Sequence, residues 1–333
     1  MLIEALVVAC LVQQVTPTNP RIVEPVATTD TLDPSPHSER FFAVNGARLH
    51  LLDWGGKGPL LMFLPGYGDT AHIFDDLAPA FTDHFHVVAL TPRGFPPSSA
   101  PNSGYTIAQL ADDVRAVMDS LRVPEAILAG HSISGAVITQ FGIVHPERLA
   151  AAVYLDASLD FGAAYQRSHR VGKPSPRDTT SVAYRAWQRR YGDSRLSPSA
   201  LAAFAANDRA WQMDSVEAAR RKELVAALAT EVRSRPHQPW LIKAPALSLC
   251  AGGSFDRGLG WLTPDSPDWN EARNYYNAVT TEKRDECEKF AARNRRAAVF
   301  ILDSGHYVFV DARDEVIHLM RSFLARVALA RAG

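Results

Sequence analysis

A serine stands among small residues in the stretch LAGHSISGAV, which covers residues 128 to 137. The residues before it (EAILAG) predict a short buried strand, and those after it (ISGAVITQFGIV) predict a helix. In this setting, the pattern GHSISG is typical of a sharp turn that holds a serine nucleophile in a strained conformation. The turn needs small residues two positions before and after the serine, a need that Gly130 and Ser134 meet. We therefore interpret Ser132 as a nucleophile, with an ordinary helix N-cap as the alternative.

A serine hydroxyl becomes a good nucleophile only when a neighbouring base removes its proton. His306 is the candidate base, because it directly follows the last predicted strand in ILDSGHYVF and so belongs to the same sheet edge as Ser132. The alternative is a surface histidine without a catalytic role. Four other histidines fall on predicted strands or helices without the spacing of metal ligands, so no metal site is expected from them: His84, His86, His131 and His145.

Predicted strands and helices alternate along most of the chain. The predicted strands are 59–66, 86–94, 125–130, 150–156, 244–253 and 297–305. Such alternation predicts an α/β fold with a mostly parallel sheet and helices on both faces, built from residues 39–160 and 243–333. Residues 161–242 have only helical patterns. They predict a helical cap insertion over the carboxyl edge of the sheet, where sheets of this kind bind ligands.

Four motifs give the chain a resemblance to the α/β-hydrolase superfamily, in its single-domain, cap-bearing form. They are LPGYGD, TPRGFPPSS, GHSISG and SGH, and the resemblance covers about residues 40 to 333. The order of Ser132 before His306 also fits. The family's pattern implies an oxyanion hole made by the backbone N–H groups of Tyr67 and Ile133. Where the family usually has histidine the chain has Pro65, a departure that affects side-chain hydrogen bonds of the loop and leaves the backbone donors in place.

The resemblance leaves two candidates for the acid that orients His306. Most members place it after the seventh strand, in the pattern P-x-L-x-L-x-G-x-x-D. On PALSLCAGGSFD this register puts Ser254 at the acid position and Asp256 two residues late. Other members, haloalkane dehalogenases among them, place the acid at the end of the sixth strand, where this chain has Asp156. Either carboxylate could hold the imidazole in its productive tautomer. We expect Asp156, with Asp256 as the alternative.

A serine at the turn favours acyl transfer, because hydroxyl attack on a carbonyl gives an oxyanion and then an acyl-enzyme that water hydrolyses. The resemblance argues against epoxide hydrolases and haloalkane dehalogenases, whose nucleophile is a carboxylate. We therefore expect a serine hydrolase that cleaves a small-molecule carboxylic ester or lactone without cofactor or metal. The alternatives are an amide, peptide or C–C bond hydrolase on the same triad, and a non-catalytic, ligand-binding member of the fold.

Aromatic residues of the predicted insertion are candidates for the substrate pocket. We expect Trp187, Tyr191 and Trp211 to line it, with Phe204 and Trp240 as further candidates. The alternative is that these rings pack in the protein interior, which is the commoner use of aromatic residues at helical spacing.

The bulk composition excludes several classes of protein. A net charge of −1 over 333 residues gives no reason to expect nucleic acid as a partner, and no apolar run is long enough to span a membrane. Cys10, Cys250 and Cys287 are too few for a disulfide framework. Residues 1–38 predict a leader and a disordered, Pro/Thr-rich tether. VVAC, which ends at Cys10, resembles a lipoprotein cleavage site and favours export to the periplasm or a lipid anchor; a cytoplasmic location is the alternative.

Overall fold

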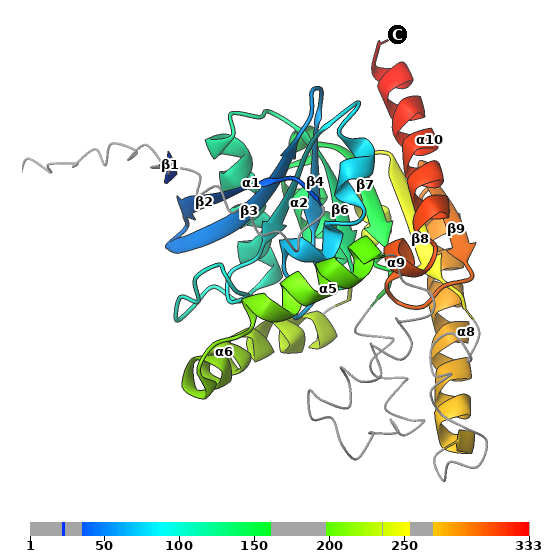
Figure 1. Ribbon diagram of the computed structural model, residues 1–333. Coiled ribbons are helices and arrows are strands. Elements are labelled where there is room, and N and C mark those ends of the chain that lie inside the picture. Colours follow the sequence, from blue (N-terminus) through cyan, green and yellow to red (C-terminus); the bar gives the residue numbers. More distant parts are fainter. Residues whose placement is uncertain (1–21, 24–34, 161–197, 235, 254–268, 333) are drawn as a thin grey trace, which may run out of the picture.

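A nine-stranded sheet forms the centre of the computed structural model, which describes residues 22–23, 35–160, 198–234, 236–253 and 269–332 (Figure 1). Its order is β1-β2-β3-β5-β4-β6-β7-β8-β9. The first three pairings in this order are antiparallel and the other five are parallel, which confirms the predicted α/β class. The strands are β1 Ile22–Val23, β2 Ser38–Val44, β3 Ala47–Gly55, β4 Leu60–Leu64, β5 His86–Thr91, β6 Ala126–His131, β7 Leu149–Leu155, β8 Ala246–Ala251 and β9 Ala297–Leu302.

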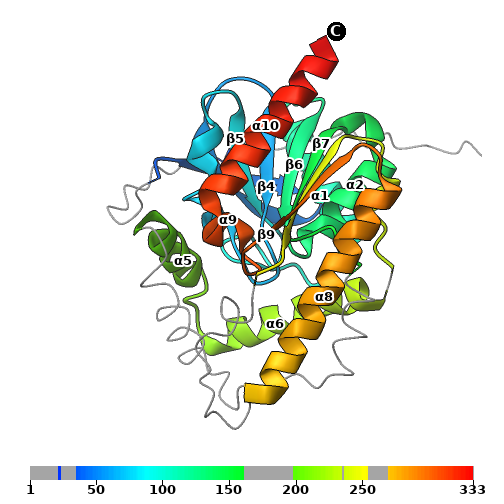
Figure 2. The same cartoon turned by 90° about the vertical axis from the view of Figure 1, so that its right-hand side faces the viewer.

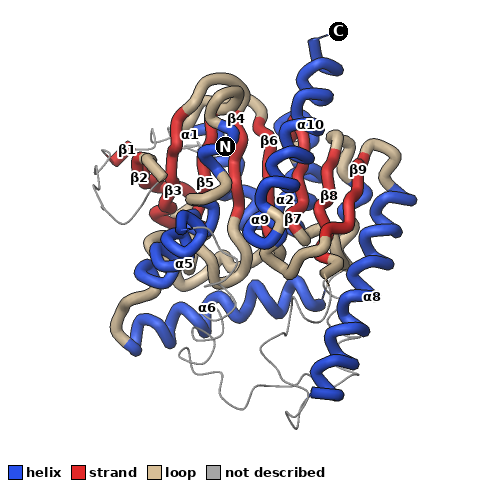
Figure 3. The backbone as a smooth tube through the Cα atoms, turned by 45° about the vertical axis from the view of Figure 1, so that its right-hand side comes forward, coloured by secondary structure: helices blue, strands red, loops and turns tan. Residues whose placement is uncertain are grey.

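Helices cover both faces of the sheet, as predicted (Figures 2 and 3). One apolar layer joins the sheet to α1 (Ile107–Ser120), α2 (Ser134–Val144) and α8 (Trp269–Arg293). The other layer contains η1, η2, α9 and α10, with bounds Ala71–Phe74, Ala78–Phe81, Val308–Asp311 and Arg313–Ala332. Because both faces are covered, a central strand such as β4 is apolar and buried along its whole length.

The stretch HIFDDLAPAFTD differs from the continuous helix that its spacing predicts. It forms two short 3₁₀ turns, η1 and η2, separated by residues 75–77. Pro79 stands in the first turn of η2, where its missing N–H is tolerated, whereas inside a longer helix it would remove a backbone hydrogen bond. The proline therefore divides the segment.

The described part of the predicted tether is ordered on the sheet. β1 pairs with β2 in antiparallel register, with Ile22 opposite Phe42. Ser35 is buried and its hydroxyl accepts a hydrogen bond of 2.6 Å from the indole N–H of Trp54. The prediction of a disordered tether over 1–38 is therefore wrong for residues 22–23 and 35–38, because β-branched residues next to an exposed strand edge can extend the sheet.

Cys10 lies outside the described residues. Within the described ranges, no helix combines the length and the hydropathy that crossing a bilayer requires.

The insertion contributes α5 (Pro198–Ala210), α6 (Ser215–Ser234) and η4 (Pro239–Leu241). The sequence predicts one helical stretch across 199–232, but the structure breaks it at 211–214. Asp214 explains the break, because its Oδ1 accepts the backbone N–H groups of Val216 at 3.0 Å and Glu217 at 2.9 Å and so caps a new helix. Of the predicted pocket residues, Trp187 and Tyr191 lie outside the described residues.

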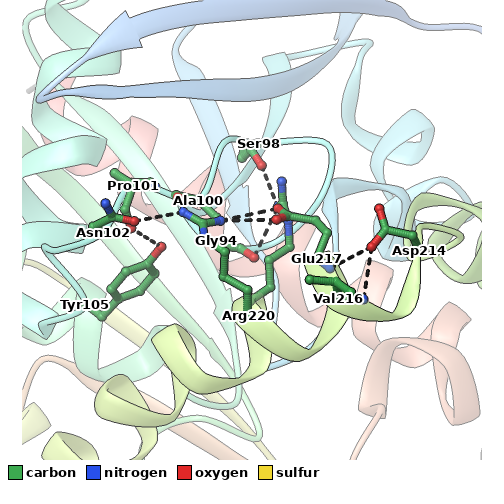
Figure 4. Close-up of polar contacts among 11 residues, drawn as sticks. Gly94, Ser98, Ala100, Pro101, Asn102, Tyr105, Asp214, Val216, Glu217 and Arg220 are labelled. Carbon is green, nitrogen blue, oxygen red and sulfur yellow. Dashed lines mark hydrogen bonds and ion pairs between the residues drawn. The ribbon is translucent and has the colours of Figure 1, made fainter.

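Polar contacts attach α6 to the loop between β5 and α1 (Figure 4). Nη2 of Arg220 donates to the carbonyl of Ala100 at 2.6 Å and to Oδ1 of Asn102 at 2.9 Å. Glu217, one turn earlier on α6, accepts hydrogen bonds from Arg220 and from Arg221. Meanwhile α5 packs against η1, which follows β4. The described part of the insertion therefore contacts segments that follow the ends of β4 and β5, at the predicted edge of the sheet.

A disulfide joins Cys250 on β8 to Cys287 on α8. The cysteine count gave no sign of it, because a single pair separated by 37 residues has no recognisable spacing. The two sulfurs meet because α8 packs against β8. One disulfide does not make a framework, so this pair is compatible with the expectation drawn from the cysteine count.

Candidate active site

Ser132 occupies a strained turn between β6 and α2. Its φ is +53°, a left-handed value that is uncommon for a residue with a side chain and costs about 1–3 kcal/mol. The backbone N–H of Gly135 donates to the Ser132 carbonyl at 2.9 Å and closes the turn. A side chain at position 135 would be impossible, since a Cβ there would stand 1.9 Å from the carbonyl oxygen of Ala157. A serine with a positive φ between a strand and a closely packed helix is the backbone geometry that the sequence predicts for this turn.

Ser134 connects the turn to the loop after β4. Its hydroxyl donates to the carbonyl of Pro65 at 2.5 Å, and the residue is buried. Gly130 provides the room for this contact, because a Cβ at that position would lie 3.1 Å from the Cβ of Ser134. The contact of Ser134 with Pro65 therefore joins the turn to the loop after β4.

Asp156 and His306 form a close pair at the carboxyl ends of β7 and β9. Nδ1 of His306 lies 2.6 Å from Oδ2 of Asp156. The carboxylate is fully buried, and its Oδ1 accepts the backbone N–H of Ala251 at 2.9 Å. Nζ of Lys283, from α8, donates to Oδ2 at 2.5 Å. Asp256, the alternative acid, lies outside the described residues.

Lys283 and His306 keep Asp156 ionised. Burial alone would raise the pKa of this carboxyl, because a charge is poorly solvated in the protein interior. The positive charge of Lys283 and the hydrogen bond from His306 outweigh burial and hold the pKa of Asp156 well below its usual range. An ionised carboxylate therefore faces Nδ1 of the histidine, which fixes the ring so that Nε2 is the nitrogen able to accept a proton.

The surroundings of His306 favour a neutral ring. Its side chain is 41% exposed, and the centroid of the His131 ring lies 4.5 Å from that of His306. Desolvation, with the electrostatic effects of His131 and Lys283, lowers the pKa of His306 to about 4, although Asp156 acts in the opposite direction. A neutral imidazole is the form that can act as a general base.

His131 connects the loop that carries His306 to the turn at Ser132. It directly precedes Ser132, is buried, and its Nε2 lies 3.1 Å from the backbone carbonyl of His306. Among the described residues, the hydroxyl of Ser132 makes no hydrogen bond to His306. Such bonds often tighten only when substrate is bound. The structure thus brings Ser132, His306 and Asp156 to one edge of the sheet, with His131 as the connecting residue.

The loop that contains Tyr67 borders the turn. The backbone N–H of Asp69 donates to the carbonyl of Gly66 at 3.2 Å, which curls the loop. In the described ranges, the backbone N–H groups of Tyr67 and Ile133 donate to no protein acceptor, so both can serve a bound oxyanion.

Trp211, which was predicted to line the substrate pocket, contacts this loop and also packs against the apolar layer of α1 and α2. Its indole N–H donates to the carbonyl of Gly68 at 2.8 Å. Phe95 connects it edge-on to Tyr67, with ring centroids 6.1 Å from Trp211 and 5.6 Å from Tyr67. Trp240, a further pocket candidate, packs against the apolar layer that includes α2 and contacts Arg293. This agrees with the alternative that these rings pack in the protein interior.

Sequence reasoning missed two residues of the site. Lys283 is separated from Asp156 by 127 residues on a charged helix, and no local pattern marks it. His131 was considered only as a metal ligand, although its place directly before Ser132 was a signal that it would lie beside the nucleophile.

Comparison with known proteins fits this architecture. The model of the family described as alpha/beta hydrolase fold matches residues 59–247, which is more than half of the chain. The chain belongs to this family.

Relatives and solved structures extend the comparison. Mouse epoxide hydrolase 3 is 36% identical over 114 residues, covering 32% of this chain and 31% of that protein. The crystal structure of E-2-(acetamidomethylene)succinate hydrolase aligns with a TM-score of 0.62 at 18% identity, over 87% of this chain and 100% of the other. The enol-lactonase of Burkholderia xenovorans LB400 aligns with a TM-score of 0.59 at 20% identity, over 86% and 99%. These structural matches demonstrate a shared fold. The matched regions cover 21% to 42% of the length of the curated relatives compared.

Proposed function

We propose that the protein is a serine hydrolase that cleaves a carboxylic ester or lactone through an acyl-enzyme. Ser132 is the nucleophile, His306 the general base and Asp156 the acid that orients it. The observation that carries the proposal is the 2.6 Å contact between Nδ1 of His306 and the buried carboxylate of Asp156, at the same sheet edge as a serine with a φ of +53°.

In this mechanism, neutral His306 accepts the proton of Ser132 through Nε2 while the serine oxygen attacks the substrate carbonyl. The resulting oxyanion accepts hydrogen bonds from the backbone N–H groups of Tyr67 and Ile133; loss of one comparable donor costs about 2.7–4 kcal/mol of transition-state stabilisation. The imidazolium then returns its proton to the leaving alkoxide. Water, deprotonated by the same histidine, hydrolyses the acyl-enzyme and restores Ser132.

Asp156 stabilises the imidazolium that forms in both steps, and Lys283 keeps Asp156 in the charged form that this requires. Since Lys283 also disfavours a positive charge on His306, it lowers the proton affinity of the base in the resting enzyme. Lys283 therefore favours both the ionised form of Asp156 and the neutral form of His306 over a wide range of pH.

The nucleophile separates this proposal from epoxide hydrolysis, in spite of the relative named epoxide hydrolase. Opening an epoxide through an alkyl-enzyme ester needs a carboxylate at the turn, and this chain has the hydroxyl of Ser132. The fold shared with an enol-lactonase is compatible with lactones as substrates. Amide, peptide and C–C bond cleavage on the same triad are the competing activities, and Trp211 is the described candidate for a substrate contact.

The test is a panel of p-nitrophenyl esters of increasing acyl length, together with lactones, amides and an epoxide. We expect turnover of esters or lactones that is lost in Ser132→Ala. Ser103→Ala is the matched control, because Ser103 is exposed on the loop before α1. Turnover of the epoxide alone, or ester turnover that persists in Ser132→Ala, would contradict the proposal. Complete inactivity of a folded protein would favour a ligand-binding member of the fold.

A further inference from the structure

A second group of histidines lies away from the proposed catalytic residues, where β2, β3 and η1 meet. His37 immediately precedes β2, Glu39 is on β2, His50 is on β3 and His72 is on η1. Their segments come together because β2 pairs with β3 and because η1 packs against β3. One potential ligand atom from each of His37, Glu39 and His72 lies within 4.8 Å of the other two. We propose that these residues and His50 bind a divalent transition-metal ion, with zinc as the best match.

Two of the rings are anchored in the way that metal ligands are. Nδ1 of His37 lies 2.8 Å from the backbone carbonyl of Ser35, and Nδ1 of His72 lies 2.9 Å from Oδ2 of Asp75. A histidine that binds a metal through one nitrogen commonly donates its other N–H to a carbonyl or a carboxylate, which fixes the tautomer and the ring orientation. We therefore assign Nε2 as the ligand atom of both rings.

His50 provides the independent sign of a ligand. Its side chain is completely buried, and Nδ1 lies 3.0 Å from the hydroxyl of Thr91. Nε2 has no hydrogen-bond partner among the described residues and points toward Glu39, whose Oε2 is 3.9 Å away. A buried polar atom without a partner is rare and unfavourable. Coordination of an ion shared with Glu39 would satisfy it.

The donor set selects the metal. Three imidazoles and one carboxylate suit zinc, whereas calcium and magnesium prefer oxygen ligands. Zinc–nitrogen and zinc–oxygen bonds of about 2.0–2.2 Å place tetrahedral ligand atoms roughly 3.3–3.5 Å apart. The separations of up to 4.8 Å among the ligand atoms of His37, Glu39 and His72 must therefore shorten by side-chain rotation. Nε2 of His50 lies 3.9 Å from Oε2 of Glu39 and would join the set through that carboxylate. Four protein ligands make a closed, structural site.

The location suggests what the ion would do. His37 belongs to the segment that follows the described β1, and His72 to the turn that follows the Tyr67 loop. An ion shared by both would fasten the amino-terminal segment to the body of the sheet. Because binding to the folded state alone stabilises it, zinc should raise the melting temperature of the full chain.

The experiment is a zinc titration of the full-length protein after treatment with a chelator, followed by calorimetry and by thermal melting. We expect one zinc per chain and an increase in the melting temperature. His72→Ala and His50→Gln should weaken zinc binding at least tenfold, whereas His84→Gln should bind normally, since His84 is 72% exposed and lies outside the group. Cys10→Ser should also bind normally, which separates this site from a thiol.

X-ray absorption at the zinc edge provides a readout that does not depend on how well the variants fold. The proposal predicts nitrogen and oxygen neighbours at about 2.0–2.1 Å with imidazole scattering. Sulfur at about 2.3 Å would overturn it. So would the absence of any stoichiometric binding to the wild-type chain, or binding that is unchanged in both histidine variants.

Discussion

The two histidine groups of this protein place the same side chain in different surroundings. In both, a ring nitrogen is fixed by an acceptor: Asp156 fixes His306, and Asp75 fixes His72. At the catalytic edge, one ring lies near a serine on a strained turn and beside a cation, Lys283. In the group around Glu39, three rings converge on a carboxylate. The number of converging donors, rather than the anchoring of each ring, distinguishes a proton acceptor from a set of metal ligands.

The electrostatic surroundings differ in the same sense. Asp156 is completely buried and is balanced by Lys283, so the site holds a fixed negative charge next to a neutral base. His50 is buried, and its Nε2 has no hydrogen-bond partner among the described residues. Protein groups alone satisfy the buried carboxylate of Asp156, whereas Nε2 of His50 lacks a partner among the described residues. The comparison predicts that changes at one group leave the function of the other intact.

The largest effect is expected for Ser132→Ala. Removing a triad nucleophile in comparable enzymes lowers the rate by about 10⁴–10⁶-fold, because no other group forms the acyl-enzyme. Ester turnover should disappear, while the stoichiometry of zinc binding stays the same. Steady-state kinetics and a zinc titration of the same preparation check both statements. Zinc binding that is lost together with turnover would break the separation of the two groups.

The second largest effect is expected for Asp156→Asn, which should lower kcat by about 10⁴-fold. An amide at this position stabilises the wrong tautomer of the histidine. Asp256→Asn is the matched control and should have a mild effect. Measured kcat values for the two variants decide between the candidate acids. A severe loss in Asp256→Asn beside a nearly normal Asp156→Asn would reverse the assignment and leave Ser132 and His306 in their roles.

The pH profile should show the influence of Lys283. Because His306 must be neutral to accept a proton, kcat/KM falls as the pH drops through its pKa. With that pKa lowered to about 4, activity should persist well below the ordinary histidine range. Lys283→Met removes a positive charge and so raises the pKa of His306, which moves the acidic limb to higher pH. An unchanged limb in the variant would show that Lys283 does not act on the base.

Trp211→Phe should have the smallest effect. It removes the hydrogen bond to the carbonyl of Gly68 and keeps an aromatic ring. Since one such bond contributes about 0.5–1.5 kcal/mol, kcat/KM should fall by roughly tenfold or less. Kinetics with short and long acyl esters distinguish loop positioning, which affects all substrates alike, from a direct substrate contact, which changes their ratio.

The features that were predictable from the sequence are those with local signals. Apolar runs between turn residues marked the parallel strands, and the strand–GHSISG–helix context marked the turn at Ser132. His306 could be predicted as the base because its position after the last strand places it at a known edge of the sheet. The sequence favoured Asp156 over Asp256 as the acid but did not decide between them. The choice depends on a register shift of two residues at the end of one strand.

Contacts between distant segments had no such signal. The pairing of Lys283 with Asp156 and of Cys250 with Cys287 depends on how α8 runs beside β8. The group around His50 depends on three segments whose histidines are 13 to 35 residues apart in the sequence, a spacing that resembles no metal-binding motif. The β1 strand was hidden because two β-branched residues within a Pro/Thr-rich stretch are too short a pattern to predict pairing.

The central claim, that Ser132 is an activated nucleophile, is tested most directly by reaction with a fluorophosphonate followed by mass spectrometry of the intact protein and its peptides. The account predicts one covalent adduct per chain, located on Ser132, formed quickly by the wild type and by Ser103→Ala and absent in Ser132→Ala. A wild-type chain that stays unmodified while folded, or an adduct on another residue that persists in Ser132→Ala, would contradict it.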